Sequence, residues 1–183
     1  LKLSRGLGDV YKRQAEEFRV VAVVYVAVLA PLIIYFLNKH KIPDWVPSFY
    51  IVGVIVCSLG WELWFTYGWI DGDPVDSRRS EVLNNWLPKN INWLLNSMAD
   101  AGTVLIGGVW LMWISHKKNS KVFTQWNWSA FCILMIWCIG QNILVEMFLY
   151  HDQLAEGKSL SWAPLSPFGA VSYTHLRAHE TAS

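Results

Sequence analysis

Residues 49–70 read FYIVGVIVCSLGWELWFTYGWI, an apolar stretch with one carboxylate, Glu62, beyond its midpoint. Ser58, Glu62 and Thr66 follow one another at intervals of four residues, so a helix would place them on one face. A stretch of about 20 apolar residues is long enough to cross a bilayer as a helix. An ionisable group inside a membrane is costly and usually faces a bundle interior or a cavity. The stretch therefore predicts a membrane-spanning helix with a polar inner face.

Three other stretches are similar in length and apolar character, at residues 18–37, 91–114 and 129–150. Backbone groups find no hydrogen-bond partner in lipid, so each stretch should be helical. Two of them carry a polar stripe with an acid of its own: Asn92, Asn96, Asp100 and Thr103 on the third stretch, and Asn142, Glu146 and Tyr150 on the fourth. The predicted fold is all-α, a polytopic transmembrane bundle of at least four membrane-spanning helices, which implies a multi-pass integral membrane protein.

The sequences at the two ends of the chain indicate that these ends do not come from the same gene as the rest. Residues 4–14 read SRGLGDVYKRQ and residues 171–181 read VSYTHLRAHET. Both match translations of one transposon-type sequencing adapter, the second from its reverse strand. Such scars are excluded from fold reasoning. We expect residues 1–14 and 170–183 to be adapter-derived, and residues 15–169 to form a truncated transmembrane helix-bundle domain.

Composition narrows the classes of function. Residues 15–169 hold ten Lys and Arg against twelve Asp and Glu, a net charge of −2, whereas the whole chain has +1. No basic patch indicates nucleic-acid binding, so none is predicted. All twelve Trp fall in this range, many near the ends of the apolar stretches, as in the interfacial belt of membrane proteins. The three Cys form no CxxC or Cys/His cluster, so no zinc site or disulfide framework is predicted.

Positive charge is equal in number on the two predicted sides of the membrane but not in density. Five lysines occupy the two short connections near residues 39–41 and 117–121, and five cations lie on the side of the long connection, residues 71–90. Dense Lys and Arg favour the cytoplasmic side. The lysine connections are therefore predicted to be cytoplasmic, with both chain ends outside.

Helix geometry predicts that the acids meet. At a rise of about 1.5 Å per residue, Glu62 and Asp100 lie roughly 12 Å below the same membrane face, and Glu146 lies about 6 Å below it. Desolvation and mutual repulsion oppose the ionisation of all three at once. A protonated carboxyl group at such a site can act as acid, base or proton carrier. The ionised form can instead pair with a cationic ligand, assisted by Trp faces.

Simpler interpretations of the same residues stay open. Asn96 and Asn142 can be interhelical hydrogen-bond partners and nothing more. Hard cations require more oxygen ligands than these stripes offer, so no metal and no cofactor are predicted. Small residues on the third stretch permit close helix packing or an oligomer: Ser97, Ala101, Thr103, Gly107 and Gly108.

Four short motifs occur in a recognisable order: WELWF at residues 61–65, DSR at 76–78, MAD at 98–100 and GQ at 140–141. This order, over roughly residues 57–169, resembles the EXPERA-type membrane proteins, which include the emopamil-binding sterol isomerases and the sigma-2 receptor. The resemblance implies a helix bundle whose cavity binds sterol-like or cationic amphiphilic ligands. In the isomerases, acids move a proton across a double bond.

The chain departs from that family at several positions. The isomerases carry a His four residues before the helix Glu, where this chain has Ser58. The second acid is offset along its helix, and it is Asp100 rather than Glu. The family's fifth helix has no counterpart in residues 15–169. Binding is thus the broader expectation, and isomerisation is the narrower one.

The leading hypothesis is a membrane protein that binds a lipidic or sterol-like ligand, with isomerisation by proton transfer as a further step. Glu62 and Asp100 would be the acid/base pair; the remaining predicted ligand contacts are Glu146, Asn96, Asn142, Trp61 and Thr66. The expected partners are membrane lipids and a lipidic or cationic amphiphilic ligand. One alternative is a proton- or cation-coupled transporter that uses the same acids as relay sites. The other is a structural or assembly subunit whose acids meet basic residues of a partner.

Overall fold

The structure, a computed structural model, describes residues 2–40, 42–68, 73–149 and 153. Within these residues every regular element is helical. In chain order they are α1 (Lys2–Asn38), α2 (Trp45–Leu59), α3 (Trp61–Tyr67), α4 (Val75–Arg78), α5 (Glu81–Trp86), α6 (Lys89–Ala99), η1 (Asp100–Ile106), α7 (Gly107–Ser115), η2 (Ser120–Phe123) and α8 (Trp128–Phe148). η1 is a π-helix that joins α6 to α7 without interruption, and η2 is a 3₁₀-helix.

Three helical rods are long and apolar enough to cross a membrane: Tyr11–Asn38, Lys89–Ser115 and Trp128–Val145. The second of these is the continuous rod α6–η1–α7. The pair α2 and α3 adds a fourth when it is counted as one span, although it is bent by 41° at Gly60. The predicted all-α architecture is confirmed for the described residues, with the difference that the second stretch is a broken helix.

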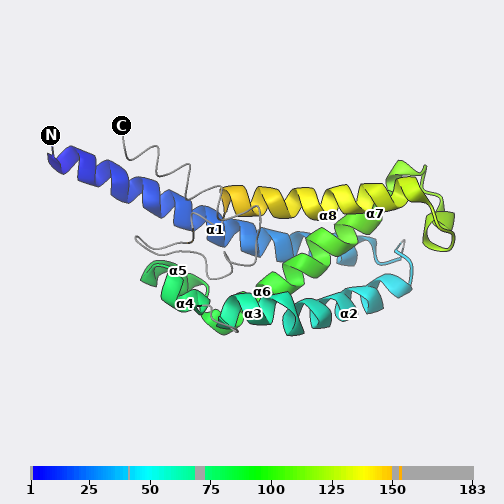
Figure 1. The fold of residues 1–183 in the computed structure, drawn as a ribbon, viewed down its shortest axis with the longest axis horizontal. Helices are drawn as coiled ribbons and strands as arrows, with labels where there is room; N and C mark the ends of the chain where they lie inside the picture. Colours follow the sequence, from blue (N-terminus) through cyan, green and yellow to red (C-terminus); the bar gives the residue numbers. More distant parts are fainter. Residues whose placement is uncertain (1, 41, 69–72, 150–152, 154–183) are drawn as a thin grey trace.

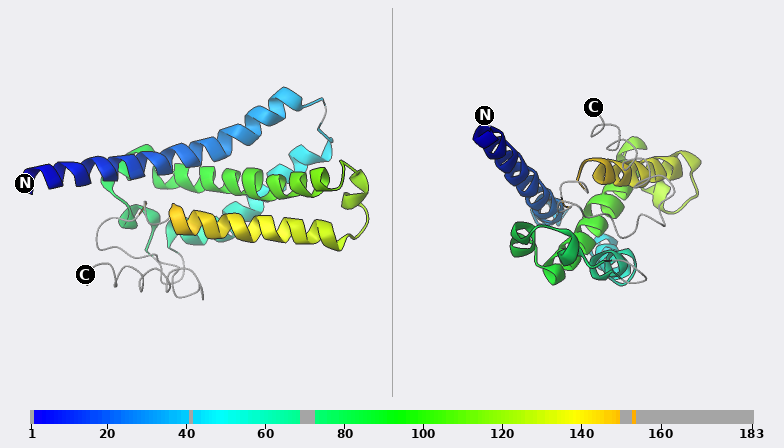
Figure 2. Two further views of the ribbon diagram at one scale, coloured as in Figure 1. Left: turned by 90° about the horizontal axis from the view of Figure 1, so that it is seen from above. Right: turned by 60° about the vertical axis from the view of Figure 1, so that its left-hand side comes forward.

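The rod α6–η1–α7 occupies the centre of the molecule. It runs diagonally between the α2–α3 pair and the layer that contains α1 and α8 (Figure 1). Its π-helical part contacts α1, α2 and α8. The turned views show α1 and α8 on different sides of the rod (Figure 2). Side chains of η1 can therefore contact three other helices, α1, α2 and α8.

The connection between α3 and α6 folds back onto the bundle as two short helices, α4 and α5. Leu83 and Leu87 pack against Val20 of α1, and these three side chains are almost fully buried. Burial of a side chain of this size contributes roughly 1.5–3 kcal/mol. This contact fixes the long connection beside α1, at the end of the bundle where α3 finishes (Figure 1).

Helix α1 begins 16 residues before the predicted span, at Lys2, and its first turns project past the other helices (Figure 1). The predicted boundary at residue 18 followed the apolar stretch alone. The preceding residues contain no proline, and they form ion pairs one turn apart, Lys12–Glu16 at 4.0 Å and Arg13–Glu17 at 3.7 Å. Such pairs support a helix without requiring an apolar face.

The small residues of the central rod allow close helix contacts within the chain. A Cβ atom on Gly53 of α2 would lie 3.2 Å from the Cβ of Ala101 in η1. A Cβ atom on Gly108 of α7 would lie 2.6 Å from Leu134 Cδ1 of α8. The predicted close packing is thus realised between helices of one chain, where Ala101 and Ser97 are fully buried.

Candidate functional site

Glu62 lies two residues after the break between α2 and α3. A Cβ atom on Gly60 would be 2.8 Å from the carbonyl oxygen of Val56, so only glycine allows the backbone to approach this closely. The break places Glu62 in the first turn of α3, where a helix dipole favours negative charge. Its side chain is buried, with 3% of its surface exposed. The Thr66 hydroxyl donates to Glu62 Oε2 at 3.4 Å, one turn further along the same helix.

The break leaves backbone carbonyls without their usual partners, and an indole from the central rod satisfies one of them. Trp93 Nε1 of α6 donates to the carbonyl oxygen of Ser58 at 2.8 Å. At the other end of α3, the Tyr67 hydroxyl donates to Asn90 Oδ1 at 2.8 Å. Buried polar backbone groups nearly always have such partners. These two bonds, one to α2 and one from α3, hold the bent pair against α6.

Asp100 is the first residue of the π-helix η1. A π-helical segment inside an α-helix is rare and frequently marks a functional site. Here again an indole compensates for irregular backbone: Trp137 Nε1 of α8 lies 3.1 Å from the carbonyl oxygens of both Thr103 and Val104. The Thr103 hydroxyl donates to the Ala27 carbonyl oxygen of α1 at 3.0 Å. η1 is therefore fixed by hydrogen bonds to two neighbouring helices, α8 and α1.

The two acids and an amide between them form one cluster. The Asn96 side chain of α6 and the Asp100 carboxyl group both lie close enough to act electrostatically on the Glu62 carboxyl group. The Cys57 thiol of α2 lies within the electrostatic range of both acids. Asp100 and Asn96 are only half-buried, whereas Glu62 and Thr66 are buried. The cluster thus has an inner acid and an outer, more accessible acid.

Of the other predicted ligand contacts, two lie elsewhere and one is not described. Asn142 on α8 is exposed, and its amide donates to the Cys138 carbonyl oxygen of its own helix at 2.8 Å. Trp61 is 46% exposed, with its ring edge-on to Trp64 at 4.7 Å. The backbone of Glu146 belongs to α8, and its side chain lies outside the described residues. α8 packs on α7 and η1, which explains why Asn142 does not reach the acids.

Two buried arginines beside the site are absent from the sequence-based prediction. Arg78 Nη2 donates to the Phe65 carbonyl oxygen at 2.7 Å, and its guanidinium lies 4.8 Å from the Phe65 ring centre. Arg79 donates to Asn92 Oδ1 at 3.0 Å and to the Leu87 carbonyl oxygen at 2.7 Å. Burial, with a contribution from Arg78, lowers the pKa of Arg79 to about 10. The sequence offers one signal for this, the Arg-Arg pair within the long connection, residues 71–90.

Metal binding has no support in the geometry. Among the described residues there is no group of three or more His, Cys, Asp or Glu side chains that could hold an ion. Two carboxyl groups and one amide provide fewer oxygens than Ca²⁺ takes in proteins. The arrangement is suited to proton transfer and to pairing with an organic cation.

No protein-family model, curated protein or solved structure matches this chain.

Proposed function

We propose that the chain is a multi-pass membrane protein that binds a lipidic ligand at Glu62 and Asp100. One observation carries this proposal: the two acids come from different spans, and each lies where its helix departs from α-helical geometry. Discontinuous helices at membrane depth are tolerated where they are buried in protein or line a cavity. They also recur at the binding sites of membrane transporters.

The exposure of the two acids assigns them different roles. Asp100 is half-buried and would contact the ligand, and Glu62 would act from behind it, held by Thr66 and Asn96. An amphiphile with an amine head group would pair with the acids, and its tail would remain in lipid. Nearby indole rings favour such a cation further. The resemblance to EXPERA-type proteins makes a sterol-like skeleton a candidate for the apolar part.

Isomerisation would use the same two groups. One carboxyl group would donate a proton to a carbon of a double bond, and the other would remove a proton from the neighbouring allylic carbon. The double bond would move with no net gain or loss of protons. This step requires one protonated and one ionised acid, which two carboxyl groups close together in a low dielectric favour.

Ligand binding can be tested on the purified protein in detergent. We would measure the thermal shift caused by a long-chain tertiary amine and by its uncharged alkyl analogue. Glu62→Gln and Asp100→Asn should each abolish the shift caused by the amine. Glu81→Gln makes the same chemical change on an exposed position of α5 and should leave the shift intact. An unchanged shift in both site variants would remove the assignment.

A proton- or cation-coupled carrier is the second candidate, and one observation favours it. Arg79 of the long connection donates to Asn92, which lies one helical turn before Asn96 on α6, so polar side chains follow one another from the long connection towards the acids. A conducting path would need polar side chains through the whole thickness of the membrane. In liposomes, a carrier should give a pH-dependent flux that Asp100→Asn abolishes. Absence of flux between about pH 5 and 8 would exclude this candidate.

A further inference from the structure

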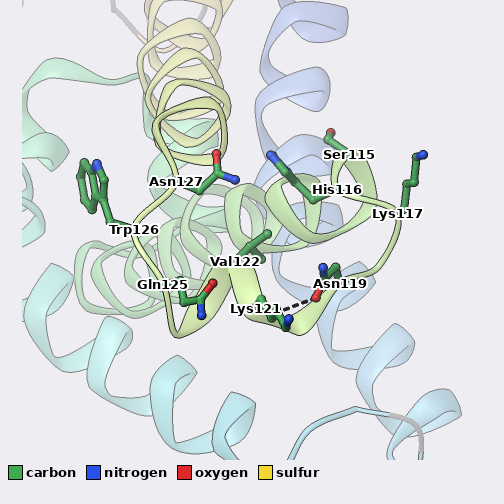
Figure 3. A pocket seen from close by; sticks show the side chains of 9 residues that line it. All are labelled: Ser115, His116, Lys117, Asn119, Lys121, Val122, Gln125, Trp126 and Asn127. Carbon is green, nitrogen blue, oxygen red and sulfur yellow. Dashed lines mark hydrogen bonds between the residues drawn. The ribbon is translucent and has the colours of Figure 1, made fainter.

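A second polar site lies at the end of the bundle away from the two acids. The residues that join α7 to α8 form a pocket of about 410 Å³ (Figure 3). Its lining includes two lysines, a histidine, three side-chain amides and an indole: Lys117, Lys121, His116, Asn119, Gln125, Asn127 and Trp126. No Asp or Glu is among the residues that line it. The pocket is therefore positively charged and rich in hydrogen-bond donors.

The pocket is built on a backbone that the chain fixes in several ways. Lys117 and Lys118 have φ angles of 57° and 61°, a backbone conformation that residues other than glycine rarely adopt. The turn is closed by a bond from Lys118 N to the Trp113 carbonyl oxygen at 2.9 Å. The Phe123 ring packs edge-on against Trp45 at 5.4 Å, which anchors this segment to the start of α2. Strained backbone conformations that the surrounding structure holds in place cluster at functional sites.

Charge and position indicate what the pocket would bind. The two connections at this end, residues 39–44 and 116–127, contain five lysines and a single acid, Asp44. The pocket lies directly between the end of one candidate span at Ser115 and the start of the next at Trp128. Trp126 and Trp128 are 67% and 68% exposed and lie edge-on at 5.0 Å. Exposed indoles beside basic residues at the end of a span are typical of the lipid headgroup region.

We propose that this pocket binds the phosphate of an anionic phospholipid headgroup in the leaflet on the lysine-rich side. Lys117 and Lys121 supply the charge, and the amide groups of Gln125 and Asn127 supply further donors. The proposal rests on the membrane placement argued above, but not on ligand binding at Glu62 and Asp100.

The test compares lipid binding by native mass spectrometry on the full chain in detergent. Phosphatidylglycerol is titrated against phosphatidylcholine, which has the same phosphate but no net charge. The wild-type chain should prefer phosphatidylglycerol by about tenfold or more, given the attraction of each lysine to anionic lipid. Lys117→Gln combined with Lys121→Gln should abolish that preference.

The matched control removes the two lysines of the other connection at the same end, Lys39→Gln with Lys41→Gln. Neither belongs to the connection between α7 and α8 that forms the pocket. The control should keep the preference; an equal loss in both double variants would show diffuse attraction and overturn the proposal. Displacement of the lipid by inorganic phosphate at similar concentration would also overturn it, because the site would then recognise free phosphate. Glu62→Gln should keep the lipid preference, which separates this outcome from failure of the acidic site.

Discussion

At the scale of single residues, the acids could be predicted and the arginines could not. A carboxylate in an apolar stretch is visible in the sequence, and helix rise gives its depth, so Glu62 and Asp100 could be paired in advance. The burial of Arg78 and Arg79 depends on how the long connection folds back, which local sequence does not specify. Both guanidinium groups donate to backbone carbonyl oxygens, of Phe65 and Leu87. Their role is visible only in three dimensions.

Asp76 gives a prediction for the dependence of stability on pH. Burial opposes its ionisation, but the hydrogen bond and the charge of Lys89, whose Nζ lies 2.8 Å away, outweigh this together with a backbone hydrogen bond and the charge of Arg79. They hold the pKa of Asp76 below its ordinary value. Because the pKa of Asp76 is lower in the folded than in the unfolded chain, its ionisation stabilises the fold at pH values above the ordinary pKa. This contribution disappears as the pH falls through the lowered pKa. Because both groups are partly exposed, the pair should contribute less than about 1 kcal/mol.

Asp76→Asn should therefore unfold slightly more easily than the wild-type chain at pH 6. The difference should shrink as the pH falls below the ordinary pKa of about 3.9, and it should vanish once the pH lies below the lowered one, where the wild-type carboxyl group is neutral too. Intrinsic tryptophan fluorescence during thermal unfolding in detergent would measure both transitions. A difference that persists unchanged at the acidic pH would contradict the ion-pair explanation.

At the scale of elements, the apolar stretches predict where helices lie but not where they break. Residues 49–70 give one continuous apolar signal, yet the helix bends at Gly60. The π-helix η1 is likewise not visible in the sequence of residues 91–114, because a local change of hydrogen-bond register leaves the apolar pattern almost unaltered. In both cases a distant tryptophan donates to the irregular backbone. Such partners become known only when the helices are placed together.

Gly60→Ala tests the break itself. The added Cβ would lie 2.8 Å from a backbone carbonyl oxygen, which cannot move aside as a side chain can. Overpacking of this kind typically costs about 1–3 kcal/mol. We expect a lower unfolding temperature and weaker binding of the tertiary amine, since Glu62 follows the break. Gly140→Ala is the control, because a Cβ there meets no atom within 4 Å. Equal effects of the two changes would argue against a specific role for Gly60.

Trp137→Phe tests the support of the π-helix. The change keeps an aromatic ring but removes the N–H group that lies 3.1 Å from the carbonyl oxygens of Thr103 and Val104. Loss of a donor to buried acceptors costs about 1–3 kcal/mol. Thermal unfolding should occur at a lower temperature, and amide exchange in residues 100–106 should become faster. Trp128→Phe alters an indole that is 68% exposed and should change neither measurement. Unchanged exchange in Trp137→Phe would mean that η1 does not depend on this donor.

At the scale of the whole molecule, a polar stripe could be predicted from the sequence, and the neighbour that it faces could not. The polar stripe of α3 meets that of the α6–η1 segment because α3 and α6 are neighbours and Asp100 directly follows α6. The stripe of α8 has the same character, but α8 packs on the other side of the central rod, and Asn142 is exposed. Helix periodicity defines a face without specifying which neighbour that face will contact.

The fold predicts how many times the chain crosses the membrane. This number can be tested by finding on which side of the membrane each connection lies. A bend of 41° leaves α2 and α3 running in nearly the same direction, whereas a re-entrant segment would have to reverse. If the pair crosses the membrane, His40 and Ser120 lie on one side and Glu81 lies on the other. The ring contact between Trp45 and Phe123 agrees with the first two sharing a side.

Single cysteines at these three positions, in a chain with the native cysteines replaced by serine, should therefore separate into two classes. A membrane-impermeant maleimide applied to sealed cells should label Glu81→Cys, and it should reach His40→Cys and Ser120→Cys only after the membrane is opened, as expected if the lysine-rich end is cytoplasmic. The reverse pattern would change the orientation but keep the four spans. Labelling that places His40→Cys and Ser120→Cys on opposite sides would require a re-entrant α2–α3 pair. Glu62 would then approach Asp100 from a hairpin rather than from a helix that crosses the bilayer.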